Sequence, residues 1–342
     1  MATPEPVKSA AAAAAPARPH LERLVALAGK RGPVPVAVAY PCDAASLEAA
    51  VLAAQARLID PILVGPAERI RALAARNALD LDGCRLLDST DDPRDAAALA
   101  AAQCRDGIAQ ALMKGSLHTD ELLGAAVSRD ARLRSERRAS HVFVLDMPGL
   151  DRPLLITDCV VNIAPGLADK RDIAQSAIDL AHALGIACPK VAILSAVETV
   201  NPAIPSTLDA AALCKMADRK QIRGAVLDGP LAFDLAISAD SARTKGIDSP
   251  VAGSPDILLV PNLEAGNIVY KQLIYMAQAD CAGVVLGMHV PIILTSRSDS
   301  VPSRVASCAL GVLAVQRKQP RPADAVRPDL DRLDLAVDLL PR

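Results

Sequence analysis

The residues best suited to chemistry in this sequence stand directly after short apolar runs. In PIILTSRSDS, an apolar run leads into Ser296, Arg297 and Asp299. A guanidinium group presents a planar fork of donors that suits a phosphate or a carboxylate. The neighbouring hydroxyl and carboxylate groups could orient a substrate or move a proton. A surface ion pair between Arg297 and Asp299 is the alternative, and the spacing alone leaves it open.

A second polar corner follows the apolar run ALM. In ALMKGSLHTDELL, Lys114, Gly115 and Thr119 stand between a predicted strand and a predicted helix. The unbonded N–H groups of a helix start, beside a lysine, can bind an anion. For this segment alone, a Ser/Thr helix cap with a solvated lysine is the favoured interpretation.

Two further strand exits carry acid and amide side chains. ITDCVVNIAP places Asp158 and Asn162 after one strand, where an Asp is as often a cap as a catalyst. DILLVPNLEAGNIVYK carries two amides, a glycine and a lysine after another, namely Asn262, Gly266, Asn267 and Lys271. Asn and Gly are common turn residues, but ligands also bind at the carboxyl ends of strands in α/β sheets.

Alternating helices and strands are expected to position these residues. From His20 onward, apolar runs such as VPVAVAY, PILVG and KVAILSA alternate with helical patterns such as ASLEAAVLAAQARL. Short apolar runs separated by helices predict parallel βαβ units covered on both faces, and hence an α/β protein. The 342 residues are enough for two domains.

Changes in composition predict where the domains begin and end. Periodicity lapses in RLRSERRASH, residues 132–141, which marks a domain boundary. The Ala/Pro-rich residues 1–19 are predicted to be a disordered leader, and the Pro/Arg/Asp-rich residues 318–342 a C-terminal extension. The last strand and helix could belong to either domain on pattern alone.

Composition argues against several classes of function. The net charge is -2 and the chain has no Trp, two Phe and three Tyr, so nucleic acid is not an expected partner. No apolar segment is long enough to span a membrane. The eight cysteines are scattered without a CxxC pair, which favours a reducing cytoplasm over disulfides or zinc. The motifs GxGxxG, GxxxxGK[ST], GxSxG and HExxH are absent.

Taken in order, these segments resemble the phosphate acetyltransferase/phosphate butyryltransferase family. VPNLEAGNIVYKQLIYMAQAD followed by GMHVPIILTSRSDS carries the resemblance, and ALMKG, ITDCVVNIAP and VLDGPLAFDLAIS stand in the family's order. The resemblance covers roughly residues 21–315 and is closer to the butyryltransferase-like branch.

The resemblance implies a two-domain, three-layer αβα fold similar to isocitrate and isopropylmalate dehydrogenases, with a cleft between the domains. In that fold the last strand and helix return to the first domain. Residues 20–138 and 286–317 would then form the first domain, and residues 139–285 the second. A homodimer or larger assembly is expected by the same analogy.

The implied reaction is reversible transfer of an acyl group between acyl-CoA and phosphate, giving acyl phosphate and CoA. Acetyl is the expected acyl group and butyryl the alternative. Arg297 is the candidate for binding phosphate, Ser296 for donating a hydroxyl and Asp299 for the general base. The candidate substrate-binding residues are Lys114, Gly115, Thr119, Asp158, Asn162, Asn262, Gly266, Asn267 and Lys271. Coenzyme A is a substrate, and neither a metal nor a tightly bound cofactor is expected.

Two positions depart from the acetyltransferase pattern. Family members usually carry an Asp six residues after the Arg, where this chain has Ser303, and an Arg where this chain has Gly124. Asp299 is therefore the candidate for the displaced base. Two other functions stay open: a dehydrogenase of the same fold acting on a 2-hydroxy acid, and a non-catalytic sensor of CoA or acyl phosphate.

Overall fold

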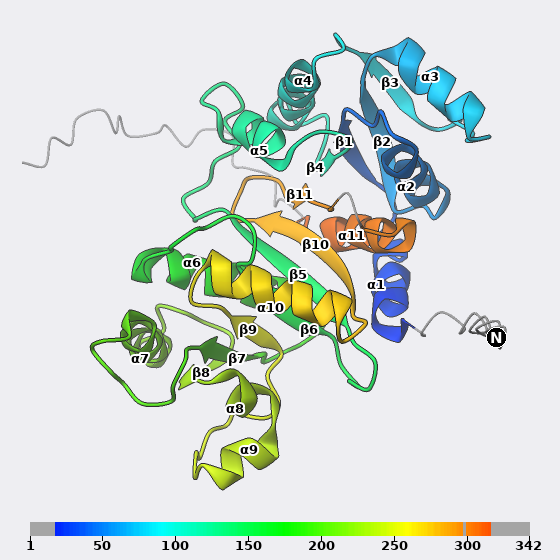
Figure 1. The fold of residues 1–342 in the computed structure, drawn as a ribbon. Helices are drawn as coiled ribbons and strands as arrows, with labels where there is room; N and C mark the ends of the chain where they lie inside the picture. Colours follow the sequence, from blue (N-terminus) through cyan, green and yellow to red (C-terminus); the bar gives the residue numbers. More distant parts are fainter. Residues whose placement is uncertain (1–17, 297–298, 316–342) are drawn as a thin grey trace, which may run out of the picture.

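An eleven-stranded sheet runs through the part of the chain that the structure describes, residues 18–296 and 299–315 (Figure 1). The computed structural model contains the strands β1 (Val34–Ala39), β2 (Ile59–Gly65), β3 (Arg85–Asp88), β4 (Ala111–Lys114), β5 (Ser140–Asp146), β6 (Leu154–Thr157), β7 (Lys190–Leu194), β8 (Val226–Leu231), β9 (Ile257–Leu259), β10 (Asp280–Leu286) and β11 (Ile292–Ile293). Its helices are α1 (Pro19–Gly29), α2 (Ala44–Gln55), α3 (Ala67–Arg76), α4 (Pro93–Arg105), α5 (Thr119–Val127), α6 (Leu167–Ala183), α7 (Pro205–Asp218), α8 (Phe233–Ile237), α9 (Ala239–Thr244), α10 (Leu263–Tyr275) and α11 (Val301–Ala314).

The strands lie in the order β3-β2-β1-β4-β11-β10-β5-β6-β9-β7-β8. Neighbours are parallel from β3 to β11 and from β6 to β8, but β10 runs antiparallel to β11 and β5, and β5 antiparallel to β6. The predicted α/β class is confirmed. The predicted parallel units lie on both sides of an antiparallel centre, where no helix separates β5 from β6 and a parallel pair would need a long crossover.

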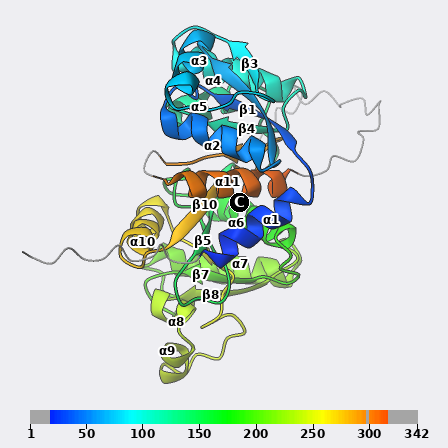
Figure 2. The same cartoon turned by 90° about the vertical axis from the view of Figure 1, so that its right-hand side faces the viewer.

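Right-handed crossovers decide which face of the sheet each helix covers. Helices α2 and α3 lead the chain from β1 outward to β3, and α4 leads it back to β4, so α4 lies on the opposite face. The last helix, α11, packs against α1 and α2 and covers β10 and β11. Figure 2 shows α2, α11 and α1 one below another along one side of the sheet.

Small side chains let the helices approach the sheet closely. The buried face of α4 consists of four alanines and a cysteine, namely Ala96, Ala97, Ala100, Ala101 and Cys104. On α11, a Cβ added to Gly311 would lie 2.5 Å from Cγ1 of Ile293, so only a glycine fits there. The buried core is dominated by Ala, Val, Leu and Ile, in keeping with the scarcity of aromatic residues in the chain.

The predicted domain boundary crosses this continuous sheet. Strand β11 pairs with β4 on one side and with β10 on the other, so hydrogen bonds link the two predicted domains. The division into domains therefore stays a prediction. Helix α1 begins at Pro19, inside the predicted leader, while residues 1–17 and 318–342 lie outside the described residues. No described helix is long and apolar enough to cross a membrane.

Candidate active site

A crevice is expected at the carboxyl ends of β1 and β4, because the chain leaves these neighbours in opposite directions. Strand β1 leads through α2 to β2, whereas β4 leads through α5 towards β5 on the other side of the sheet. Ligands of α/β proteins bind at such switch points. Strand β11 is parallel to β4, so its exit lies at the same edge. The structure thus brings together the predicted residues Lys114, Gly115 and Ser296.

Gly115 allows the exit of β4 to approach the exit of β1. Its N–H donates to the carbonyl of Ala39 at 2.9 Å, and an added Cβ would lie 2.3 Å from that same oxygen. A larger residue would push the two strand ends apart. This contact fixes the backbone of Lys114, whose buried Nζ lies 3.5 Å from the carbonyl of Gly115. Thr119 is the first residue of the helix that follows.

The carboxylate of Asp299 is turned back onto its own loop. The backbone N–H of Ser296 donates to Oδ2 of Asp299 at 2.6 Å. Burial raises the pKa of Asp299 above its ordinary value, and this hydrogen bond and the charges of Arg304 and Lys114 offset the rise only in part. Loss of solvation thus outweighs the attraction of these two cations for the ionised form. Arg297 lies outside the described residues, so its role stays a prediction.

Arg304, which the sequence did not single out, holds this loop in place. The guanidinium is buried and donates from Nε to the carbonyl of Asp299 at 3.2 Å and from Nη2 to the carbonyl of Ser296 at 3.0 Å. It stands in the first turn of α11, after the cap residue Ser300. Arg304 therefore adds a second buried cation at these strand exits and fixes the backbone that carries the predicted catalytic residues.

Asp43 also lies at this edge of the sheet, although the sequence patterns above did not identify it as a candidate. Burial alone would raise the pKa of its carboxyl, but hydrogen bonds from Ser46 and Ser116 and the charge of Arg304 hold the pKa below the usual range. The sequence did contain a sign of it. A polar residue of PCD follows the apolar run VPVAVAY, just as the polar residues of KGS follow the apolar run ALM. Only the pairing of β1 with β4 shows that these two exits belong together.

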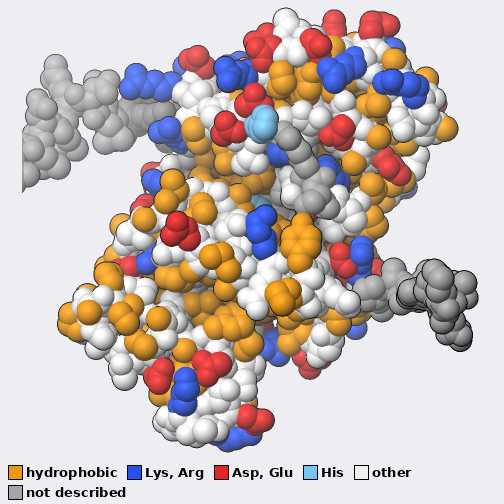
Figure 3. Space-filling model, viewed as in Figure 1, with side chains coloured by type: hydrophobic (Ala, Val, Ile, Leu, Met, Phe, Trp, Pro, Cys, Tyr) orange, Lys and Arg blue, Asp and Glu red, His pale blue; other side chains and the backbone are white. Residues whose placement is uncertain are grey.

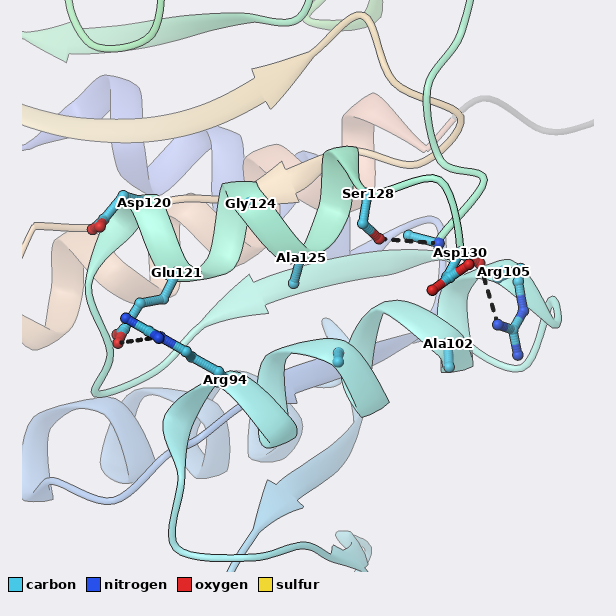
Figure 4. A pocket seen from close by; sticks show the side chains of 11 residues that line it. Arg94, Ala102, Arg105, Asp120, Glu121, Gly124, Ala125, Ser128 and Asp130 are labelled. Atoms are coloured by element: carbon cyan, nitrogen blue, oxygen red, sulfur yellow. Dashed lines mark hydrogen bonds and ion pairs between the residues drawn. The ribbon is translucent and has the colours of Figure 1, made fainter.

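A shallow groove of about 510 Å³ lies between α4 and α5 (Figure 4). Gly124, where the family resemblance leads one to expect an arginine, lines it. Two arginines of α4 reach the groove, but Arg94 pairs with Glu121 at 3.7 Å and Arg105 with Asp106 at 2.8 Å. Because acids already balance these cations, the groove suits an anion less well than the crevice does.

Asp158 and Asn162, at the exit of β6, hold their own loop together. The carboxylate of Asp158 accepts three backbone N–H groups of the loop, and also Nδ2 of Asn162 at 2.6 Å. Asn162 in turn donates to the carbonyl of Ala139 at 2.8 Å and accepts from Nε of Arg138 at 2.6 Å. These bonds within the protein favour a capping role, and the predicted contacts of both residues with substrate stay predictions.

The start of α10 packs against the exits of β6 and β9. Asn262 caps the helix by accepting a backbone N–H of its first turn at 2.9 Å. Gly266 permits close packing, because an added Cβ would lie 2.6 Å from a side chain at the exit of β9. Nδ2 of Asn267 donates to a backbone carbonyl at the exit of β6 at 3.2 Å, and Lys271 is exposed further along the helix.

Aromatic and thiol side chains lie between helix α10 and the central strands β5 and β10. The rings of Phe143 and Tyr270 are stacked with centroids 3.7 Å apart, and Oη of Tyr270 lies 3.4 Å from Sγ of Cys281. Burial raises the pKa of Tyr270 strongly, and the charge of Asp299 adds to the rise. Helix α10 thus comes within electrostatic reach of the loop that carries Asp299.

The exits of β1, β4 and β11 are best suited to hold a phosphate group. The buried cations Lys114 and Arg304 stand near the starts of α5 and α11, where backbone N–H groups also favour an anion. A carboxyl group with a raised pKa, Asp299, could exchange a proton there. Across residues 18–296 and 299–315, no three His, Cys, Asp or Glu side chains converge as a metal site requires.

Comparison with known proteins decides the family. The family described as "Phosphate acetyl/butaryl transferase" matches residues 90–312. This chain belongs to that family. A phosphate acetyltransferase from Rhizobium meliloti is 54% identical over 312 residues, which cover 91% of this chain and 98% of the relative. A phosphate butyryltransferase from Clostridium beijerinckii is 42% identical over 284 residues, 83% of this chain and 94% of the relative.

A solved structure agrees with these relatives. A branched-chain phosphotransacylase from Enterococcus faecalis V583 superposes with a TM-score of 0.72 at 31% identity, covering 82% of this chain and 99% of that protein. The predicted family and the predicted enzyme class, an acyltransferase, are confirmed. The mixed α/β fold with one large sheet matches that structure. The roles assigned to individual residues stay predictions.

Proposed function

We propose that the crevice at β1, β4 and β11 transfers an acyl group reversibly between acyl-CoA and phosphate, giving acyl phosphate and CoA. The observation that carries the proposal is the convergence of two buried cations, Lys114 and Arg304, on the loop of Asp299. Phosphate and acyl phosphate are anions that such a crevice fits. Coenzyme A acts as the second substrate, and the reaction needs no resident cofactor.

In the direction that forms the thioester, Asp299 removes the proton of the CoA thiol. A free thiol has a pKa of about 8.5, so a carboxylate base raises the thiolate fraction near neutral pH. The thiolate then attacks the carbonyl carbon of the acyl phosphate. Negative charge develops on the carbonyl oxygen, and the hydroxyl of Ser296 is the candidate donor to it. The C–O bond to phosphate breaks, and phosphate leaves with the bonding electrons, stabilised by Arg297 and Lys114.

The two substrates bind together, so the transfer is direct and forms no acyl-enzyme intermediate. We assign the opposite wall of the substrate cleft to the start of α10, where Asn267 and the exposed Lys271 can meet the phosphates of CoA. This arrangement corresponds to the two-domain, isocitrate dehydrogenase-like organisation inferred from the sequence. The greater identity to an acetyltransferase supports acetyl as the preferred acyl group. A cytoplasmic location follows from the cysteine usage.

A thioester assay separates this proposal from its rivals. Purified protein is mixed with CoA and acetyl phosphate or butyryl phosphate, and thioester absorbance is followed with and without EDTA. We expect thioester to form in the absence of added metal, faster with acetyl phosphate. A sensor would bind CoA without turnover, and a dehydrogenase would reduce a nicotinamide with a 2-hydroxy acid. Absence of thioester with both acyl phosphates would refute the proposal.

A further inference from the structure

A second switch point lies at the other end of the sheet, between β7 and β9. Strand β7 leads through α7 outward to β8, whereas β9 leads through α10 back to β10. Because these crossovers join parallel strands and are right-handed, α7 and α10 lie on opposite faces and leave a crevice at the strand ends. A cavity of about 550 Å³ lies there, within the size range of small-molecule sites.

The walls of this cavity are mainly apolar. Leu194 contributes from the exit of β7, Val260 from the exit of β9, Phe233 from the start of α8 and Val269 from α10. Such walls exclude water from part of the cavity and favour a ligand with a short hydrocarbon body. Asn262, predicted from the sequence to bind substrate, lines the same cavity.

A buried lysine supplies the main polar feature. Lys170 is only 5% exposed, and its Nζ donates to Oδ2 of Asp209 at 2.6 Å. An ammonium group has three N–H donors, and Asp209 is its one acceptor among the described residues. Donors left without an acceptor in a buried site are costly, so this lysine favours an oxygen acceptor inside the cavity.

Two hydroxyl groups add to the excess of donors. Oγ of Ser195 and Oγ of Ser206 lie 2.8 Å apart, and since only one can donate to the other, the second proton is available. Ser206 stands in the first turn of α7, whose cap position, Ile204, has no capping side chain. Pro205 has no N–H and the N–H of Thr207 already donates to the carbonyl of Ile204, so the helix start offers an anion the N–H of Ser206.

We propose that this cavity is a second ligand site, which binds a small carboxylate with a short apolar body. The ligand's carboxylate accepts hydrogen bonds from Lys170 and the serine pair, while its body packs against Phe233 and Val269. The one carboxylate of the lining, Asp209, is already paired and does not repel the ligand strongly. The site uses none of the proposed catalytic residues and shares only Asn262 with the predicted substrate-binding residues.

Calorimetric titration of the full chain with sodium butyrate, in the absence of CoA, tests the site. Butyrate should bind, and butyramide, which has the same shape but no charge, should bind at least tenfold more weakly. The double variant Lys170→Met/Asp209→Leu replaces the ion pair by apolar side chains of similar volume, a change that proteins often tolerate. It should weaken butyrate binding at least tenfold while circular dichroism stays unchanged.

A milder variant covers the case in which the double variant fails to fold. Ser206→Ala should weaken butyrate binding about tenfold, because it removes one hydrogen bond to a charged group. Ser89→Ala, which removes a hydroxyl bonded to the carbonyl of Thr90 outside the cavity, should bind as wild type does. Arg297→Ala, which removes the cation proposed to bind phosphate, should also retain butyrate binding, which separates this site from the active site.

Three results would overturn the inference: no butyrate binding by the wild-type protein, equal binding of butyramide, or binding that Ser206→Ala leaves unchanged. Loss of butyrate binding in Arg297→Ala would likewise overturn it, because the anion would then occupy the active site. None of these results bears on whether the protein forms a thioester.

Discussion

At the scale of single residues, the protonation state of Asp299 decides whether it can act as the base. Burial raises the pKa of this carboxyl, so it loses its basic form at a higher pH than an exposed Asp does. If Asp299 is the base, Asp299→Asn should lower kcat/KM most below the thiol pKa of about 8.5. The rate should recover in part as pH rises, because more CoA thiolate then forms unaided. The measurement is the pH profile of kcat/KM for both proteins.

The same substitution has a signature in stability. The folded-state pKa of Asp299 lies above its unfolded value, so ionisation of the carboxyl destabilises the fold as pH rises through that interval. Relative to wild type, Asp299→Asn should therefore gain stability above the interval, which thermal melts at several pH values can show. A deficit in rate that is constant across the pH range would instead assign Asp299 a purely orienting role.

Arg304 is predicted to act through the loop that it holds. Arg304→Met removes the bonds to two loop carbonyls and should lower the free energy of unfolding by about 1–3 kcal/mol. It should also lower kcat at least ~10-fold, because the loop no longer holds the reacting groups in place. Arg304→Lys should recover little, since one ammonium cannot replace a planar fork. Unchanged kcat in a destabilised Arg304→Met would limit this residue to stability.

At the scale of elements, the approach of β4 to β1 sets the shape of the crevice. Gly115→Ala would place a Cβ 2.3 Å from the carbonyl of Ala39, so we expect a loss of about 1–3 kcal/mol in stability and lower activity. Gly124→Ala is the matched control, because nothing lies within 4 Å of its Cβ and alanine favours a helix by about 1 kcal/mol. Equal melting temperatures for the two variants would contradict this account.

The strand exits were predictable because apolar runs end abruptly at polar residues such as Lys114 and Ser296. Arg304 was not predictable, since it donates to backbone carbonyls of a loop that only the packing of α11 brings near. The cavity beside Lys170 was missed for a related reason. It depends on α7 and α10 lying on opposite faces, which requires the strand order. The antiparallel centre of the sheet is likewise set by the short connection after β5, which carries no helical pattern.

At the scale of the whole molecule, apolar side chains remain exposed to solvent. Figure 3 shows hydrophobic side chains gathered over the lower half of one face, where α10 lies. Ile268, Tyr275 and Met276 of that region are 66%, 69% and 78% exposed. Exposed apolar surface often marks association, and the family resemblance implies a homodimer. Light scattering coupled to gel filtration should give at least twice the monomer mass, and a monomer at micromolar concentration would contradict this expectation.

Acyl transfer is proposed to take place at the exit of β11, where Ser296 leads into Arg297. The most direct test is kcat/KM for thioester formation from acetyl phosphate and CoA by Arg297→Ala, with circular dichroism as the control for folding. Loss of one donor aimed at transition-state charge typically costs about 3 kcal/mol, so we predict a loss of at least ~100-fold in a folded protein. Arg297→Lys should be impaired too, because a point charge lacks the fork. A folded Arg297→Ala with nearly wild-type kcat/KM would show that the chemistry takes place elsewhere.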